Sequence, residues 1–428
     1  MPNCLSRVLV FLIVALGTAL PAYSQRVGVK PSSDGDAARR ATEKQSRPRV
    51  ASPSDAAELA AQNPFAARAN REVRPSQTET SAGQTPTMVP RANQTETTGV
   101  DTLVLRDGSR LEGAITRFSG AGGATIMVGD REHRVEFARI ERLDANVSET
   151  FVRAVEAFEA GRRSGLDSEY RRALALFKES RASAERSFEK EWATAKIVET
   201  LLALGRQDEA IVEFFILCRL DPYSAFLSSI PLLWQNQRSA RTDAAAARNA
   251  QETAALWLDP RDNPTNAPNP VGRLLAASTL MRSAKHGAAA VAALRELGAL
   301  APPDDADPDM VETCRLVSLL ALAQLWRDDV LKKPEQKVVD RWIRVLELFP
   351  NAYKPGPAAL IALGEKALRN DAEAARYFTL AGMLTNDRAL AIECLGEACD
   401  AYERQGLKKP AEKLRAFLAK ENVQSEQR

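Results

Sequence analysis

The sequence predicts an α+β protein built from a disordered N-terminal region, a small β-barrel and a mainly α-helical solenoid. Residues 25 to 99 are rich in Ser, Thr, Pro and Gln and have too few large apolar side chains to offset the entropy of ordering. From residue 101 apolar residues recur with period two, and from residue 148 to about residue 420 with period 3.6. The predicted divisions are a signal peptide (1–24), a disordered linker (25–100), a barrel (101–146), a solenoid (148–422) and a disordered tail (423–428).

Composition and charge indicate no particular class of partner. The 428 residues are 45% hydrophobic and 27% charged, which is enough material for more than one domain. The formal net charge is only +2, so nothing in the charge balance indicates a nucleic acid or an acidic membrane surface. We expect neither as a partner.

The first 24 residues have the features of a secretory signal. Arg7 precedes an apolar core at 8–20, and small residues at 22 and 24 suit cleavage before Gln25. An uncleaved membrane anchor is the alternative, but the apolar run is shorter than the ~20 residues that a bilayer core needs. The sequence therefore predicts an exported protein, periplasmic or attached to the cell envelope, without stable membrane insertion after cleavage.

Four cysteines follow the signal, and each lies in an apolar helical pattern. They are Cys218, Cys314, Cys394 and Cys399. The last two are five residues apart, about 140° around a helix, which suits neither a disulfide nor a shared metal. Buried free thiols are the favoured interpretation, and pairing with a distant cysteine stays open.

The predicted barrel consists of two hairpins and a last strand. Two alternating runs flank Asp107-Gly108, a strong hairpin signal, and a second pair of runs turns at Gly129-Asp130. A short strand follows at 139–143. The Gly-rich stretch 119–123 is predicted to be a loop between strands, since no Gly-Lys-Ser/Thr follows it as a phosphate-binding loop requires. Five short strands in about 45 residues predict a small SH3-like or Sm-like barrel.

Part of this module resembles the first Sm-like motif. Leu105, Asp107, Gly108, Gly113 and Phe118 match its apolar, Asp-Gly, Gly and Phe positions. The base-binding loop with its Asn and the later Arg-Gly pair of that family are missing. RNA binding is therefore not implied, and a structural or protein-docking role is favoured for the module.

The stretch 195–222 is the clearest helical hairpin. Two helix-period apolar patterns are separated at Gly205, and the second ends at Pro222. On the second, a small Ala210 lets the paired helices approach, and Phe214 one turn later fills the space toward the next hairpin. These four residues resemble the second half of a tetratricopeptide (TPR) unit, whose period is about 34 residues. The resemblance implies a helical solenoid that binds other proteins.

Similar markers predict about seven TPR-like hairpins, longer than strict TPR units and interrupted by a Pro-rich loop at 259–270. The markers outside the second hairpin are Gly161, Ala173 and Phe177; Trp234, Ala244 to Ala247 and Trp257 in a degenerate third unit at 226–260; Ala290, Leu294, Leu297 and Pro302; Trp326, Trp342, Val345 and Pro350, with a turn at 332–334; Ala374, Phe378 and Ala381; and Tyr402, Gly406 and Ala411.

The TPR resemblance also implies a concave groove lined by the first helices of successive hairpins. The family's groove positions fall on Glu199, Arg282, Arg327, Lys366 and Asp400. The three basic residues favour an acidic peptide or a carboxylate tail as the ligand, whereas the alternative is an ordinary solvated helix face. The Lys and Asn positions of the carboxylate clamp found in some TPR proteins are not matched.

Residues that carry catalysis or bind metals are scarce. Histidine occurs only as His133, on a predicted strand, and as His286, at a predicted turn, and no recognised nucleophile, zinc or nucleotide motif is present. The acidic stretch 304–310 resembles the start of a calcium loop, but Met310 stands at the required Gly. Helix initiation at Pro308 explains the stretch better. We predict no catalytic residue, cofactor or metal.

The sequence thus favours a non-enzymatic, exported scaffold that binds a protein or peptide partner in a solenoid groove. The alternative is an envelope enzyme or ligand-binding protein with its site between the barrel and the first hairpins. A pocket with convergent polar groups there is expected for the alternative, and a dry apolar contact for the scaffold.

Overall fold

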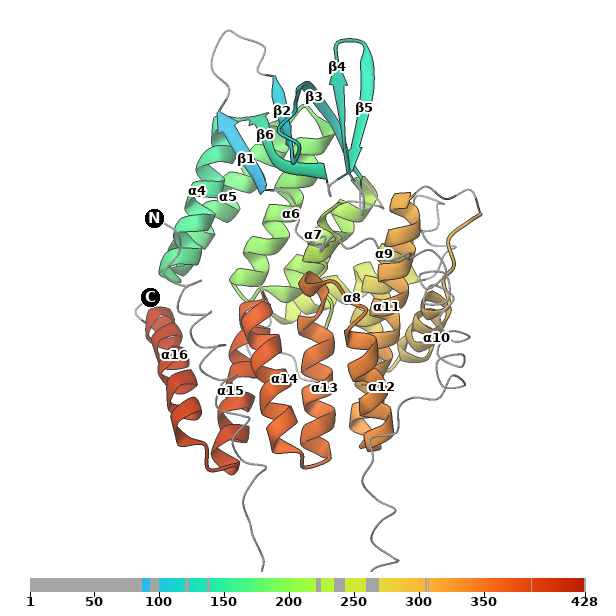
Figure 1. Ribbon diagram of the computed structural model, residues 1–428, viewed down its shortest axis with the longest axis vertical. Coiled ribbons are helices and arrows are strands. Elements are labelled where there is room, and N and C mark those ends of the chain that lie inside the picture. The colour runs from blue at the N-terminus through green and yellow to red at the C-terminus, as the bar shows by residue number, and fades with distance from the viewer. Residues whose placement is uncertain are drawn as a thin grey trace, which may run out of the picture. The chain divides into compact units, whose positions relative to one another are not determined.

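Thirteen α-helices and one six-stranded sheet make up the part of the chain that the computed structural model describes (Figure 1). All of it belongs to the unit 78–428. The predicted signal peptide, most of the predicted linker and the Pro-rich loop up to residue 268 lie outside the described residues. The described residues are 87–92, 100–119, 123–136, 139–220, 225–234, 243–258, 269–304, 306, 308–385 and 387–426.

Five strands form where the turn signals predict them. Gly108 and Gly129 have positive φ of 82° and 59° in the two hairpin turns, a conformation that glycine adopts without steric cost. Strand β3 ends at Ser119 and β4 begins at Gly123, and residues 120–122 of the predicted loop lie outside the described residues. The strands are β2 (Asp101–Leu105), β3 (Arg110–Ser119), β4 (Gly123–Val128), β5 (Arg131–Glu136) and β6 (Ile140–Val147). Their buried apolar residues include Leu103, Ile115, Ile126 and Leu143.

The predicted closed barrel is wrong, because the described sheet is open. Its strand order is β1-β6-β2-β3-β4-β5, and β1 and β5 lie at opposite ends. The strand β1 (Thr87–Ala92) falls in the predicted linker and pairs with β6 in parallel. At the other end, β5 carries five charged or histidine side chains in six residues, a composition that disfavours further strand pairing. The sheet therefore stays open, because β1 forms one of its edges and the charged β5 forms the other.

Consecutive helices pack against one another. They are α4 (Glu149–Ser164), α5 (Asp167–Ser183), α6 (Ser187–Ala203), α7 (Gln207–Leu220), α8 (Ala244–Leu258), α9 (Pro270–Leu280), α10 (Gly287–Gly298), α11 (Pro308–Leu331), α12 (Gln336–Leu346), α13 (Pro355–Ala367), α14 (Asp371–Leu384), α15 (Arg388–Arg404) and α16 (Lys408–Glu426). Helix α11 meets α12 through the stacked rings of Trp326 and Trp342. Two short 3-10 helices, η2 (Ala225–Ser229) and η3 (Asn351–Tyr353), precede α8 and α13. Six helical hairpins result, and each of them was predicted.

Three details differ from the sequence prediction. The degenerate third unit is one helix, α8, preceded by η2, because its first half has no sustained apolar period. Gly161 is not in a turn: it lies inside α4 against the ring of Tyr170, while Gly165 with φ 70° ends the helix. Finally, α16 continues to Glu426, into the predicted disordered tail.

Other local predictions agree with the structure. The four cysteines are buried free thiols. His133 lies on β5, His286 lies in the turn before α10, and α11 begins at Pro308. None of the described helices is both long enough and apolar enough to cross a membrane.

The clearest predicted hairpin, α6 and α7, has the expected packing. Gly205 turns the chain with φ 70°, and Ala210 and Phe214 are buried. Because Ala210 is 0% exposed, we expect Ala210→Leu to lower the free energy of unfolding by about 1–3 kcal/mol through overpacking. Urea denaturation checks this, with the exposed Ala245→Leu on α8 as the control. An unchanged unfolding midpoint for Ala210→Leu would contradict the assigned register.

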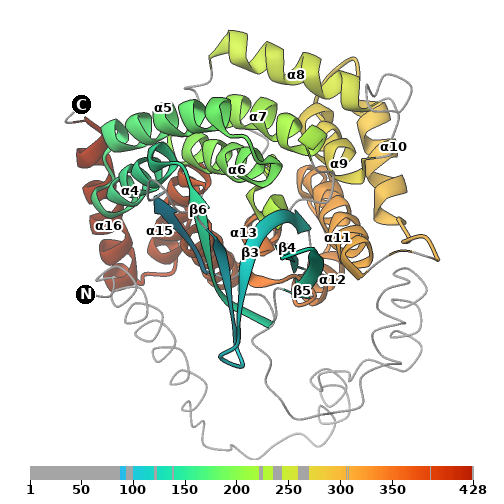
Figure 2. The same cartoon turned by 90° about the horizontal axis from the view of Figure 1, so that it is seen from above.

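The last hairpins return to the first. Helix α15 contacts α6, and Arg388 at the start of α15 forms an ion pair of 2.9 Å with Asp167 at the start of α5. The sheet lies at one end of the helices in Figure 1, and Figure 2 shows it over their centre. Contacts of β1 with α4 and of β3 with α6 attach it there.

The Arg388–Asp167 pair lends itself to a double-mutant cycle. Both side chains are mostly buried, with 20% and 25% exposed, so we expect a coupling energy near the upper end of the ~0.2–1 kcal/mol range of exposed pairs. The cycle compares Arg388→Ala, Asp167→Ala and the double variant by urea denaturation in low salt. Strictly additive effects would mean that the ion pair contributes nothing to the contact between the first and last hairpins.

Candidate functional site

Several of the first helices of the hairpins meet along one side. Helix α9 contacts α11, α11 contacts α13, and α15 contacts α6, while an ion pair links α13 to α15. We call this side of α6, α9, α11, α13 and α15 the inner face. It is defined by the residues Glu199, Ser278, Arg282, Arg327, Asp328, Gly356, Lys366 and Glu397, and four of the five predicted groove residues are among them.

Arg282 and Arg327 come together between α9 and α11, but they differ in exposure. The guanidinium of Arg282 forms an ion pair of 3.0 Å with Asp328 and donates to the carbonyl oxygen of Arg327. Arg327 is only 1% exposed and donates at 3.0 Å to the carbonyl oxygen of Ser278, in the last turn of α9, and at 3.0 Å to Gln324 Oε1. Arg327 therefore caps a helix end inside the protein instead of facing a groove.

The surroundings of Arg327 disfavour its positive charge. Burial lowers the pKa of Arg327 to about 10, and the neighbouring positive charge of Arg282 acts in the same direction. Asp328 opposes the shift but does not cancel it. The cationic form of Arg327 is held at a cost, which fits a structural capping role rather than an open anion site.

The other predicted groove residues are separate from this pair. Lys366 forms an ion pair of 2.5 Å with Glu397 of α15. Glu199 accepts hydrogen bonds from Lys196 at 2.7 Å and from Ser229 Oγ at 3.1 Å. Asp400 is exposed on α15. The structure thus brings two of the five together and gives the accessible cations Arg282 and Lys366 acidic partners from the next first helix.

The sequence did not predict the short segment that lies across the inner face. We call residues 225–234 the crossing segment. Ser229 bonds to Glu199 of α6, the backbone N–H of Leu233 donates to Ser278 Oγ of α9 at 3.0 Å, and the ring of Trp234 lies against Gly356 of α13. Three of its apolar side chains are buried, Phe226, Leu227 and Leu232. The segment has no apolar period, so the sequence held no signal for its position.

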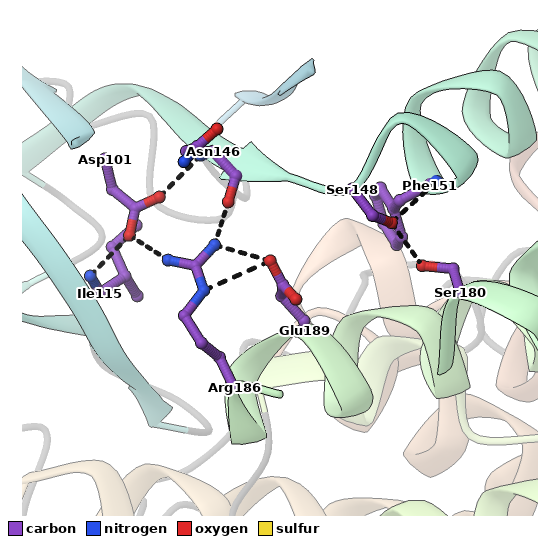
Figure 3. Close-up of polar contacts among 8 residues, drawn as sticks. All are labelled: Asp101, Ile115, Asn146, Ser148, Phe151, Ser180, Arg186 and Glu189. Atoms are coloured by element: carbon purple, nitrogen blue, oxygen red, sulfur yellow. Dashed lines mark hydrogen bonds and ion pairs between the residues drawn. The ribbon is translucent and has the colours of Figure 1, made fainter. Parts of the chain in front are cut away.

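A second polar cluster joins the sheet to the helices (Figure 3). The carboxylate of Asp101 at the start of β2 is 0% exposed. It accepts hydrogen bonds from the backbone N–H groups of Ile115 and Asn146, both at 2.7 Å, and from Arg186 Nη1 at 2.6 Å. Arg186 also donates to the Asn146 carbonyl oxygen and to Glu189 Oε1. We call Asp101, Asn146, Arg186 and Glu189 the junction cluster.

The chemistry of the junction cluster is that of a structural link. Burial works against the charge of Arg186, but the hydrogen bonds and charges of Glu189 and Asp101 outweigh it and raise its pKa. The Arg186 guanidinium lies 5.1 Å from the centre of the Phe188 ring, which stacks on Trp192. The contact between sheet and helices thus includes buried charged and polar groups, and these groups bond to one another.

One more buried acid lies near the inner helices. Glu365 of α13 is 1% exposed, and burial raises its pKa despite hydrogen bonds donated by Gln336 and Asn370. Its partners hold the start of α12 and the turn after α13 to the same carboxyl group. Among the described residues, no group of three or more His, Cys, Asp or Glu is placed to hold a metal ion.

Comparisons with known proteins find no relative: no family model, no curated protein and no solved structure matches the chain. The TPR resemblance therefore depends on the marker residues and on the hairpins that they predicted.

Proposed function

We propose that the chain is an exported, non-enzymatic scaffold whose TPR-like solenoid binds a protein or peptide partner on the inner face. The observation that supports this most is the succession of contacts between first helices, which joins residues of separate hairpins into one face. Such a face suits an extended ligand that spans several hairpins. The signal-like residues 1–24 support export.

The charges of the inner face favour a partner that carries carboxylates. The Arg282 and Lys366 side chains are 36% and 38% exposed although each has an acidic neighbour. A partner carboxylate competes with Asp328 or Glu397 for the same cation without having to enter the protein interior. The alternative site at the junction cluster is less favoured, because its carboxylate and guanidinium groups already bond to one another.

Neutralising the two accessible cations tests this proposal. Arg282→Gln with Lys366→Gln, made in the full-length protein, should reduce capture of the partner by in-cell cross-linking at least tenfold, equivalent to ~1.4 kcal/mol. Neutral side chains avoid placing a new acid beside Asp328 and Glu397. The matched control is Arg344→Gln, since Arg344 is exposed on α12. Equal capture by a folded double variant and by wild type would contradict an acidic partner on this face.

A further inference from the structure

We propose that the crossing segment is an intramolecular occupant of the partner site, which an extended peptide must displace; this inference depends on the proposed function. Residues 225–234 contact α6 through Ser229, α9 through Leu233 and α13 through Trp234. These helices belong to three different hairpins. A segment that reaches all three lies across the inner face, where the partner is proposed to bind.

The crossing segment is held as a bound peptide is held. Its backbone N–H at Leu233 donates to the side chain of Ser278, and its carbonyl at Leu232 accepts from Gln207 Nε2 at 3.4 Å. Side chains that bond to backbone groups do not distinguish one sequence from another, so a second extended chain is able to make the same bonds. Its buried side chains Phe226, Leu227 and Leu232 supply the apolar contacts.

The position of the crossing segment also defines the partner's chemistry. Ser278, which bonds to Leu233, lies in the last turn of α9, four residues before Arg282 in the turn that follows the helix. A ligand that replaces the segment and continues past Ser278 therefore meets a partly exposed cation. The partner is an extended, mainly apolar peptide with an aromatic side chain and a neighbouring carboxylate.

Gly356 makes the site sensitive to a single methyl group. A Cβ atom at this position would lie 2.0 Å from the Trp234 ring, so an alanine there and the indole exclude one another. The matched control is Gly396 in α15, where an added Cβ meets no atom within 4 Å. The two substitutions add the same methyl group to a helix, and only one removes the space that the indole fills.

The test measures how tightly a fluorescein-labelled peptide with the sequence of residues 225–234 binds to the full-length protein. Binding is followed by fluorescence anisotropy. Trp234→Ala weakens the resident segment and leaves its site intact, so the peptide should bind at least tenfold more tightly than to wild type. Adding Gly356→Ala should abolish this gain, whereas adding Gly396→Ala should preserve it. A peptide of scrambled order should not bind.

Two results would overturn the inference: a folded Trp234→Ala protein with wild-type affinity for the peptide, or a gain that Gly356→Ala leaves unchanged. If Trp234→Ala does not fold, Trp234→Leu keeps most of the apolar bulk and should still bind the peptide about threefold more tightly than wild type. No gain from that variant would have the same meaning.

Partner capture separates this inference from the proposed function. If wild type and Trp234→Ala capture the partner equally, the segment does not compete, although the scaffold function stands. If the peptide binds as expected but neither protein captures a partner, the scaffold function fails while the resident segment is still an occupant of a peptide site.

Discussion

Asp101→Ala should lower the free energy of unfolding by about 3–5 kcal/mol, the range for removing one partner of a buried ion pair. The carboxylate is completely buried and accepts hydrogen bonds from two strands and from Arg186. Its removal leaves the N–H groups of Ile115 and Asn146 without that acceptor and the guanidinium without its closest acid. The measurement is urea denaturation followed by far-ultraviolet circular dichroism.

The control for Asp101 is Glu141→Ala, because Glu141 is an exposed acid on strand β6 of the same sheet. Its effect should stay within about 0.5 kcal/mol. Asp101→Asn should fall between the two, since an amide retains one acceptor oxygen. A loss below 1 kcal/mol for Asp101→Ala would mean that the junction cluster does not hold the sheet to α6.

Arg327→Ala should lower the free energy of unfolding by about 2–4 kcal/mol. The substitution leaves the buried carbonyl of Ser278 without the donor that caps α9, at a cost of ~1–3 kcal/mol, and creates a cavity. Removal of a buried charge offsets part of this loss. The exposed Arg344→Ala on α12 is the control and should change stability by no more than about 0.5 kcal/mol.

The pH dependence of Arg327→Ala gives an independent check. The pKa of Arg327 is lowered to about 10 in the folded protein and is higher in the unfolded chain. Below pH 10 both states hold the proton and the cost of the buried charge is fully present. Above pH 10 the folded state releases the proton first, so the contribution of Arg327 to stability rises with pH. The difference between wild type and Arg327→Ala should widen above pH 10, and a constant difference would contradict the assignment.

Local chemistry explains which parts of the fold the sequence predicts. The turns at Gly108 and Gly129 depend on adjacent residues, and the hairpin α6 and α7 depends on an apolar period ended by Gly205. Closure of the sheet depends on which strands pair at its ends. The strand β1 lies far along the chain from its partner β6 and has no local signal that names this partner. Local sequence patterns therefore predict strands and hairpins, but they do not predict which strands form the open edges of the sheet.

The predicted groove shows a similar limit. The repeat register places Arg282, Arg327 and Lys366 on first helices; Arg327 and Lys366 lie there, whereas Arg282 lies in the turn just after α9. A register states which helix carries a residue but not how much of its side chain is exposed, and Arg327 is buried by its contacts with Ser278 and Gln324. The position of the crossing segment could not be predicted for another reason: it is set by contacts with α6, α9 and α13, which lie far away in sequence.

The return of α15 to α6 has a consequence for how the molecule unfolds. In an open row of repeats each unit touches only its neighbours, so the ends fray and partly folded chains persist. Here the last hairpin contacts the first through Arg388 and Asp167, and the second through α15 and α6. Opening either end removes contacts from the other, so we expect the helices to lose structure together in one cooperative transition.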